Sequence, residues 1–212
     1  MTLSVEPQKY RLDDSLMRVM DLALAVLMLF VSALPMLFIA GMILLDDGRP
    51  VLFRQVRVGR GGRRFTILKF RTMTHDRNRA TGSVMGPITA ADRRKFETTV
   101  SGDPRITRIG RVLRPLHIDE LPQILNVFSG DMSMVGVRPD VPVQEADYTF
   151  QEWSRRHVLR PGITGLAQIE GSVNNMAART ALDLEWVCNR SIKLYLIVLF
   201  RTFFKVLKRN SL

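Results

Sequence analysis

The stretch LALAVLMLFVSALPMLFIAGMILL, residues 22–45, decides the architecture of this chain because it contains no charged side chain. A straight α-helix of this length measures roughly 36 Å, and the hydrocarbon core of a bilayer is about 30 Å thick. About twenty residues with four acidic side chains precede the stretch, which is unlike a cleavable signal peptide. The sequence therefore predicts a membrane-embedded helix rather than a leader or a buried helix of a soluble protein.

Two residues in this stretch bear on how the helix meets the membrane. Pro35 removes a backbone hydrogen bond and bends the helix, and Ser32 offers its hydroxyl to a freed backbone group. Lys and Arg occur on both flanks, whereas a spanning helix usually leaves one flank poor in them. The pattern favours a re-entrant helix that enters and leaves by one face, and the alternative is a single span with a proline kink.

The charge balance narrows the class of partner. The chain carries 31 Lys and Arg against 20 Asp and Glu, a net charge of +11, which indicates an anionic membrane face, a phosphorylated substrate or nucleic acid. No zinc-ligand spacing, basic helix with heptads or aromatic RNA-binding box occurs in the sequence, so we expect no nucleic-acid partner. Cys188 is the single cysteine, which excludes an internal disulfide and disfavours a structural Cys/His metal site.

A second membrane signal is SIKLYLIVLFRTFFKVLKR, residues 191–209. At about 100° per residue its basic side chains gather on one face, and Leu, Ile, Val and Phe fill the rest of the helix. The basic side chains are Lys193, Arg201, Lys205 and Lys208. The pattern predicts an interfacial helix with its basic face toward lipid phosphates, and the alternative is an amphipathic helix that packs on the protein core.

The residues after the membrane segment predict a small β-hairpin. VLFRQVRV (51–58) and RFTILKF (64–70) alternate apolar with polar side chains, and Gly59 to Gly62 supply a turn. Lys69 and Arg71 fall at the end of the second strand, where we expect them to meet a substrate, although a basic hairpin is often only a solvated edge. The polar residues 74–101 predict a loop followed by a short helix at 90–98.

The acidic pair Asp119–Glu120 is the candidate catalytic centre. Four arginines precede it at every third position and predict a cationic stripe on a helix that Pro115 ends: Arg105, Arg108, Arg111 and Arg114. Two acids at the start of a helix usually only complement the helix dipole. Beside these arginines, however, we expect an ionised Asp119 that can attack phosphorus, and a neighbouring Glu120 that can hold a divalent cation. Residues 132–135 predict a short strand after this helix.

Several motifs in order resemble one family. DPRITRIGRVLRPLHIDELPQILNVFSGDMSMVGVRP (103–139) and RPGITGLAQ (160–168), preceded by KFRTM (69–73) and the apolar segment, resemble the bacterial sugar transferases. Within that family the chain is similar to the small monotopic polyprenyl-phosphate phosphoglycosyl transferases, over about residues 18–209. The resemblance implies an α+β, mainly helical fold: an N-terminal region at 1–46 with a re-entrant membrane helix, and a cytosol-facing catalytic domain at 47–212 with a small β-hairpin and interfacial amphipathic helices.

The resemblance also implies a reaction on the cytoplasmic face of the bacterial inner membrane. The aspartate matching Asp119 attacks the β-phosphate of a UDP-sugar and releases UMP, and undecaprenyl phosphate then takes the phosphosugar to start an exopolysaccharide, O-antigen or glycoprotein. The glutamate matching Glu120 helps to bind Mg²⁺. The residue pattern and the resemblance together give these expected substrate-binding residues: Lys69, Arg71, Arg111, Arg114, Gln123, Arg138, Pro139, Arg160, Pro161 and Gly162. They leave the sugar open, and also the oligomeric state, a homo-oligomer included.

The chain departs from the family pattern near the membrane helix and the loops. Two residues separate Ser32 from Pro35, Met17 stands where many members have a lysine, and Tyr195 stands where many have an acid. His117 replaces a small hydroxyl residue, and Val137 replaces a proline. Two alternative functions stay open: a non-catalytic membrane-anchored scaffold within a polysaccharide assembly complex, and a nucleotide-sugar hydrolase in which water replaces the lipid.

Overall fold

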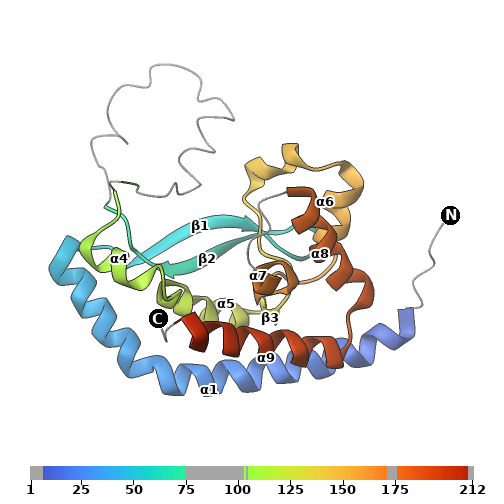
Figure 1. Ribbon diagram of the computed structural model, residues 1–212, viewed down its shortest axis with the longest axis horizontal. Helices are drawn as coiled ribbons and strands as arrows, with labels where there is room; N and C mark the ends of the chain where they lie inside the picture. Colours follow the sequence, from blue (N-terminus) through green and yellow to red (C-terminus); the bar gives the residue numbers. More distant parts are fainter. Residues whose placement is uncertain (1–6, 75–102, 104, 171–175, 210–212) are drawn as a thin grey trace.

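The computed structural model describes residues 7–74, 103, 105–170 and 176–209; the predicted helix at 90–98 and nearly all of the predicted loop before it lie outside this range. Within these residues the chain is mainly helical and has two small two-stranded sheets. The α+β prediction is therefore confirmed. Figure 1 shows one long helix along one side of the molecule, with the other elements arranged over it.

The long helix α1 (Pro7–Asp47) carries the apolar segment and contains Pro35. Its side chains point largely away from the protein: Phe30 is 85% exposed and Leu34 is 77% exposed. It is the one helix in the described part of the chain that is long and apolar enough to cross a membrane. Figure 1 shows it curved along its length, as proline inside a helix favours. An apolar helix with its surface turned outward indicates a membrane protein.

The Ser32 hydroxyl does not replace the hydrogen bond that Pro35 removes. Proline lacks the N–H that would bond to the carbonyl four residues earlier, which belongs to Val31. Ser32 Oγ donates instead to the Met28 carbonyl at 2.6 Å. The prediction for Ser32 is therefore wrong in its partner. Such a bond to the preceding turn itself bends helices, so the two residues favour curvature in the same stretch.

The predicted β-hairpin is confirmed as β1 (Leu52–Val58) and β2 (Arg64–Phe70), which pair antiparallel with Leu52 opposite Phe70. The turn contains a short 3₁₀ helix, η1 (Arg60–Gly62). Gly61 and Gly62 have φ angles of 65° and 76°, a region that favours glycine. The sequence RGGR thus gives a tight turn that places Arg60 at the tip.

The predicted arginine stripe is only partly helical. α4 spans Arg108–Leu113 and begins after Thr107, whose side chain accepts a hydrogen bond from the Gly110 N–H. Arg105 precedes this cap and pairs with Asp103 at 2.5 Å, so it does not continue the stripe. A Cβ on Gly110 would lie 2.2 Å from the Thr72 carbonyl oxygen, which explains why α4 packs tightly against the end of β2.

The acidic pair begins a 3₁₀ helix rather than an α-helix. η2 spans Ile118–Gln123 and continues directly into α5 (Ile124–Ser129). The buried Asn126 joins α5 to β2, because its side chain accepts from the Leu68 N–H at 3.0 Å and donates to the Thr66 carbonyl at 2.8 Å. These two bonds hold the acidic turn beside the end of β2.

A second sheet brings two distant loops together. The predicted strand at 132–135 is confirmed as β3 (Ser133–Val135), and it pairs parallel with β4 (Gly162–Thr164). A Cβ on Gly162 would lie 2.0 Å from the Gly136 N–H nitrogen. The glycine of the RPG motif therefore allows two backbones to touch. The sequence predicts Gly162 as a substrate-binding residue, and this contact gives that role no support.

The region after β3 packs through a buried charge network. η3 (Pro142–Asp147) leads to α6 (Phe150–Arg156), followed after β4 by α7 (Leu166–Glu170) and α8 (Met176–Asn189). Arg156 at the end of α6 is buried, donates to Asp140 at 2.9 Å and also pairs with Asp183 of α8. The Tyr148 ring lies 4.7 Å from its guanidinium carbon. Arg156 therefore links the loop after β3 to α8.

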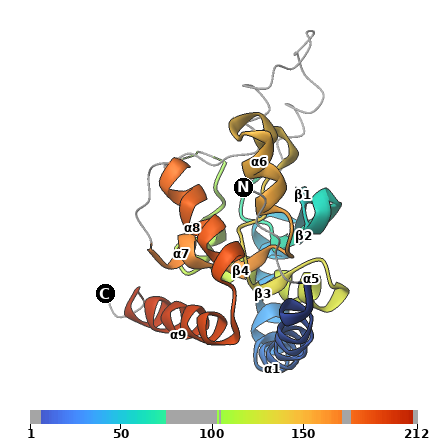
Figure 2. The same ribbon diagram turned by 90° about the vertical axis from the view of Figure 1, so that its right-hand side faces the viewer.

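The C-terminal helix α9 (Ile192–Arg209) confirms the predicted amphipathic helix, and it lies on the same side of the molecule as α1 (Figures 1 and 2). Its exposed apolar side chains include Phe200 at 66% and Phe203 at 60%. Two of its basic side chains face the protein, however. Lys205 donates to the Gln168 and Ile169 carbonyls, and Arg201 pairs with Glu170 at 2.8 Å. The prediction that all four basic residues face lipid is therefore wrong for these two, because they bind the end of α7.

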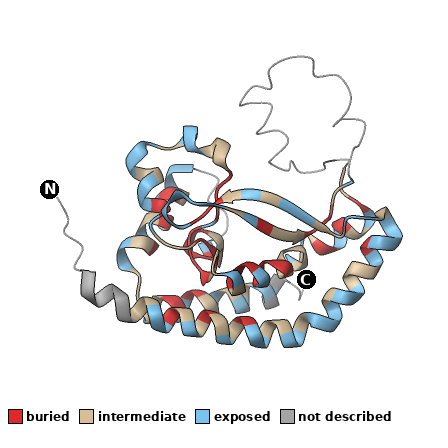
Figure 3. Ribbon diagram, turned by 180° about the vertical axis from the view of Figure 1, so that it is seen from behind, coloured by how far each residue is buried: buried red, intermediate tan, exposed pale blue. Residues whose placement is uncertain are grey.

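α1 contributes to both hydrophobic cores of the protein. The larger core contains Met17 and Ala25 of α1 together with Trp186 and Tyr195, and the smaller contains Ile43 with Phe70 and Leu113. Figure 3 shows short buried stretches interspersed with intermediate and exposed ones along α1. The buried Asp21 also accepts from the Tyr195 hydroxyl at 2.8 Å. Three of the departures from the family pattern, Met17, Tyr195 and Val137, are thus core residues.

Candidate active site

The acidic pair lies against the end of β2. Lys69 Nζ donates to Glu120 Oε1 at 2.5 Å, and the two side chains are 16% and 19% exposed. His117 directly before the turn has a φ of 55°, an uncommon conformation for a residue with a side chain. The left-handed residue redirects the chain so that Asp119 and Glu120 fall in the first turn of η2. The site is built from one strand end and one 3₁₀ turn.

The pKa values of the two carboxyl groups shift in opposite directions. Burial, and then the charge of Glu120, raise the pKa of Asp119 to about 6, against the lowering effect of Lys69 and Arg114. Burial alone would raise the pKa of Glu120 too, but the charges of Lys69 and Arg138 outweigh it and hold that pKa below its ordinary value. Burial also lowers the pKa of Lys69. The sequence predicts that the arginines beside Asp119 hold it ionised. Burial instead dominates and raises its pKa, although a carboxyl with a pKa of about 6 is still mostly ionised at neutral pH.

Asp119 opens into a cleft of about 1180 Å³, between the hairpin, the end of α4 and the loop after β3. Among the described residues it is the one acidic side chain in the lining. The basic side chains of the lining are Arg54, Arg57, Lys69, Arg71, Arg105, Arg114, Arg138 and Arg179. A cleft with this charge suits a ligand with several negative charges, such as a diphosphate.

Four of the predicted substrate-binding residues meet Asp119 in this cleft. They are Lys69, Arg114, Arg138 and Pro139. Arg71 also lines it, but its guanidinium donates to the Asp47, Gly48 and Arg49 carbonyls and pairs with the Asp47 carboxylate at 3.2 Å. Arg71 therefore fastens the end of α1 to the hairpin.

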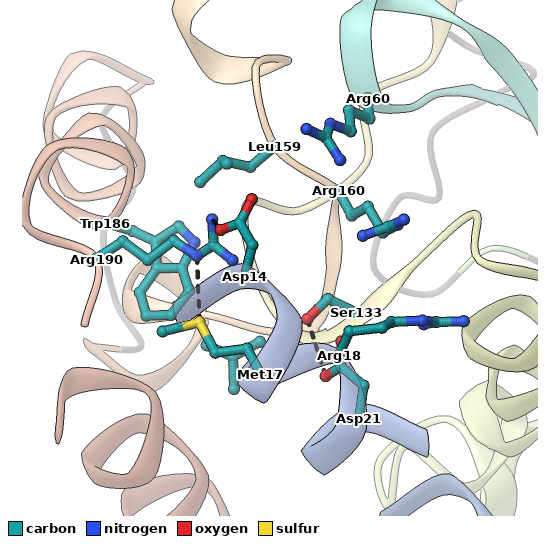
Figure 4. Close-up of a pocket in the computed structure, with 11 residues that line it drawn as sticks. Asp14, Met17, Arg18, Asp21, Arg60, Ser133, Leu159, Arg160, Trp186 and Arg190 are labelled. Atoms are coloured by element: carbon teal, nitrogen blue, oxygen red, sulfur yellow. Dashed lines mark hydrogen bonds and ion pairs between the residues drawn. The ribbon is translucent and has the colours of Figure 1, made fainter. Parts of the chain in front are cut away.

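The other predicted binding residues lie elsewhere. Arg111 is exposed on α4 and Gln123 is 2% exposed in the core, and neither is in the lining of the cleft. Pro161 and Gly162 are buried at the start of β4. Arg160 lines a second, smaller pocket beside α1, shown in Figure 4. The RPG motif thus does not share a cavity with the acidic pair.

The loop that carries Arg138 and Pro139 is fixed from three directions. Arg57 donates to the Pro139 carbonyl at 3.0 Å, and the Val58 N–H donates to the Asp140 carbonyl at 2.9 Å. The Asp140 carboxylate accepts from the buried Arg156. The Arg138 side chain is exposed on this fixed backbone, so it is available to a ligand in the cleft.

With this geometry in place, the comparisons with known proteins agree with it. A family model described as bacterial sugar transferase matches residues 12–209. The chain belongs to the bacterial sugar transferase family. The predicted resemblance is therefore confirmed, and the match covers α1, the cleft and α9.

Relatives of known name differ in length. The chain is 41% identical over 194 residues to a UDP-glucose:undecaprenyl-phosphate glucose-1-phosphate transferase of Caulobacter vibrioides, covering 87% of this chain and 67% of that protein. It is 37% identical to the exopolysaccharide production protein PSS of Rhizobium leguminosarum, covering 94% and 99%. A Komagataeibacter xylinus undecaprenyl-phosphate glucose phosphotransferase is 39% identical, covering 92% and 36%. The chain thus spans about a third of that longer relative.

In this sugar transferase the cleft contains residues that sequence reasoning missed. Arg54 and Arg57 lie in β1, where alternation shows only that they are polar, while Gln144 and Arg179 come from η3 and α8. No local pattern joins Arg179 to Asp119, because their meeting depends on the packing of α8. The one sequence signal for these missed cleft residues was the pair of arginines in β1, Arg54 and Arg57.

The acidic pair fits a divalent cation, although only in part. Among the described residues no group of three His, Cys, Asp or Glu side chains could hold a metal ion. Glu120 Oε1 bonds to Lys69, which leaves Glu120 Oε2 and the Asp119 carboxylate. Mg²⁺ is commonly held by one or two carboxylates, with water and substrate phosphates as its other ligands. The donor set therefore matches a cation that binds together with a diphosphate.

Proposed function

We propose that this sugar transferase moves a sugar phosphate from a UDP-sugar to undecaprenyl phosphate through a covalent intermediate on Asp119. The observation that carries the proposal is the placement of one acidic side chain, Asp119, in a cleft lined by arginines and a lysine. Relatives whose names state UDP-glucose and undecaprenyl phosphate support the same reaction. Their names also include an N-acetylgalactosamine phosphotransferase, so the sugar itself stays open.

In the first step a carboxylate oxygen of Asp119 attacks the β-phosphorus of the UDP-sugar. A bond forms between that oxygen and phosphorus, the bond from phosphorus to the bridging oxygen breaks, and UMP leaves with the electron pair. A carboxylate with a pKa of about 6 is mostly ionised at neutral pH and still a stronger base than an ordinary aspartate. Burial therefore favours its use as a nucleophile.

In the second step a phosphate oxygen of undecaprenyl phosphate attacks the same phosphorus. The bond between phosphorus and Asp119 breaks, which returns the carboxylate and yields a lipid diphosphate sugar. The cations around Asp119 stabilise both steps, because negative charge on the transferred phosphoryl group persists throughout. Lys69, Arg114 and Arg138 line the same cleft as Asp119 and would supply this stabilisation.

Glu120 and Asp119 would hold Mg²⁺ together with the diphosphate. When bound, the cation would neutralise phosphate oxygens and assist the departure of UMP. Lys69 donates a hydrogen bond to Oε1 of Glu120, so Oε2 is the oxygen that would bind the cation. Removal of divalent cations with EDTA is expected to abolish turnover, and added Mg²⁺ is expected to restore it.

We place the protein on the cytoplasmic face of a bacterial inner membrane, with α1 re-entrant. Pro35 within α1, the exposed apolar surfaces of α1 and α9, and the basic residues on both flanks of the apolar run support this topology. Cysteine labels placed at each terminus of the full chain test it. Reaction of both labels only after permeabilisation is expected, and a terminus that reacts from outside would restore the single span.

A panel of radiolabelled UDP-sugars tests the enzyme. We expect at least one donor to label the protein covalently and to release UMP, and we expect Asp119→Asn to lose both signals. Normal turnover in Asp119→Asn would mean another nucleophile. A chain that is labelled by no donor would favour the scaffold, and sugar phosphate released without added polyprenyl phosphate would favour the hydrolase.

A further inference from the structure

The pocket beside the start of α1 gathers three arginines from distant parts of the chain. Arg18 comes from α1, Arg60 from the hairpin tip and Arg160 from the segment before β4. In Figure 4 the side chains of Arg18 and Arg160 extend to the same side, and Arg60 descends from the hairpin above them. Burial, together with the charges of Arg18 and Arg60, lowers the pKa of Arg160, as crowding of like charges requires.

The acidic residues of this pocket are occupied by other partners. Asp14 pairs with Arg190. Asp21 accepts hydrogen bonds from the Ser133 hydroxyl, the Met134 N–H and the Tyr195 hydroxyl. Within the described residues, none of the three arginines forms an ion pair with a carboxylate. The charges of Asp21 and Asp14 act on Arg160 without a direct contact, and they do not prevent the lowering of its pKa.

Backbone contacts account for part of this arrangement but leave donors unused. Arg18 donates to the Phe128 and Met132 carbonyls at 3.4 Å each, and Arg160 Nε donates to the Gly130 carbonyl at 2.8 Å. A guanidinium has five N–H donors, so each arginine keeps several. Arg60 is exposed, and within the described part of the chain its side chain makes no hydrogen bond. Its side chain is free to close over a ligand.

The pocket also lies at the level where lipid head groups are expected. Arg18 and Asp21 directly precede the uncharged run that begins at Leu22. A helix that leaves the hydrocarbon core at this point meets phosphates at the membrane surface. Guanidinium groups bind phosphate through charge-assisted and often bidentate hydrogen bonds.

We infer that Arg18, Arg60 and Arg160 form a binding site for the phosphate monoester of a membrane lipid, separate from the cleft that contains Asp119. Three positive charges match the two negative charges of a monoester better than the single charge of a diester. The source of the phosphate is either a bilayer lipid such as phosphatidic acid or the polyprenyl phosphate acceptor, which would be held here before its phosphate moves to Asp119 for transfer. The second source rests on the proposed function, whereas the first does not.

Binding to the full chain in detergent micelles tests the site, with phosphatidic acid as the monoester probe and phosphatidylglycerol as the diester. Arg60→Gln is expected to weaken binding of phosphatidic acid by about tenfold, the usual loss of one charge-assisted hydrogen bond. Arg63→Gln is the matched control: it removes the same charge from the same exposed turn but lies outside the pocket lining. It is expected to change the affinity less than about twofold.

Equal losses in Arg60→Gln and Arg63→Gln, or no loss in either, would overturn the site, since diffuse charge would then explain the binding. Equal affinity for phosphatidic acid and phosphatidylglycerol would overturn the preference for a monoester. Transfer assays separate the two sources. A raised KM for undecaprenyl phosphate in Arg60→Gln, with normal labelling by UDP-sugar, assigns the pocket to the acceptor, and an unchanged KM assigns it to a bilayer lipid. If no donor supports turnover, the lipid-binding result still stands.

Discussion

Replacement of Asp119 by asparagine should make the protein more stable at neutral pH. Burial and the charge of Glu120 raise the pKa of Asp119 from 3.8 to about 6 in the folded protein. The folded state therefore binds the proton more tightly than the unfolded state does. No penalty exists below pH 3.8, the penalty grows as the pH rises to about 6, and it stays constant above that pH. Asparagine carries no charge and avoids the penalty.

The magnitude follows from the size of the pKa shift. A shift of about two pKa units corresponds to roughly 3 kcal/mol of unfolding free energy at pH 8, and about half of this remains at pH 5. For a protein of this size, 1 kcal/mol changes the melting temperature by about 2–4 °C. Asp119→Asn is therefore expected to melt about 6–12 °C higher at pH 8 and about half as much higher at pH 5.

Thermal unfolding in detergent micelles, followed by tryptophan fluorescence, measures the difference. EDTA is included so that no divalent cation binds the carboxylates. Glu185→Gln removes an exposed acid from α8 and serves as a control that is expected to leave the melting temperature unchanged. Glu120→Gln is expected to lower it, because the buried ammonium of Lys69 then loses its carboxylate partner.

Two results would refute this reasoning. One is an Asp119→Asn variant no more stable than the parent at pH 8, which would mean that the carboxyl is well solvated. The other is a gain that is the same at pH 5 and pH 8, because a gain independent of pH cannot come from ionisation of Asp119.

Three further predictions concern the rate of covalent labelling and the melting temperature. Covalent labelling by a UDP-sugar should fall about tenfold for each unit of pH below 6, as Asp119 becomes protonated, and a rate that is flat down to pH 4 would contradict the raised pKa. Lys69→Met should reduce the labelling rate at least about tenfold, because it removes a cation from the cleft and leaves Glu120 unpaired; quenched single-turnover reactions would show this. Gly136→Ala should lower the melting temperature, since its Cβ would lie 2.6 Å from a backbone nitrogen, whereas Gly41→Ala, with no atom within 4 Å, should not.

The sequence predicts the elements whose signals are local. The alternation in β1 and β2 and the amphipathic pattern of α9 each reflect a repeat within a few residues, so their bounds agree closely with the structure. The apolar run predicts α1 from its composition, but the helix begins well before the run, at Pro7. The arginine spacing predicts a helix that includes Arg105, but α4 begins only at Arg108. The reason is that Thr107 caps the helix and that Arg105 pairs with the Asp103 carboxylate. The capping residue Thr107, rather than the three-residue spacing of the arginines, determines where α4 begins.

Properties of the site that depend on tertiary packing are beyond the reach of local patterns. The raised pKa of Asp119 results from burial, which composition does not reveal. Arg160 begins the RPG motif and is predicted to bind substrate, yet packing of β4 on β3 brings it to the pocket beside α1. Arg179 reaches the cleft only because α8 folds back through the Arg156–Asp183 contact. The acidic pair is recognisable in advance, and its surroundings are not.

The place of α1 in both cores has a consequence for how this protein can be handled. Met17 and Ala25 pack in the same core as Tyr195 and Val198 of α9, so the first and last described helices close one interior together. A fragment that begins after Asp47 would expose that interior and would be expected to aggregate rather than to yield a soluble enzyme. Folding of this interior can be completed only after α9 has been synthesised, because no earlier part of the chain supplies Tyr195 and Val198.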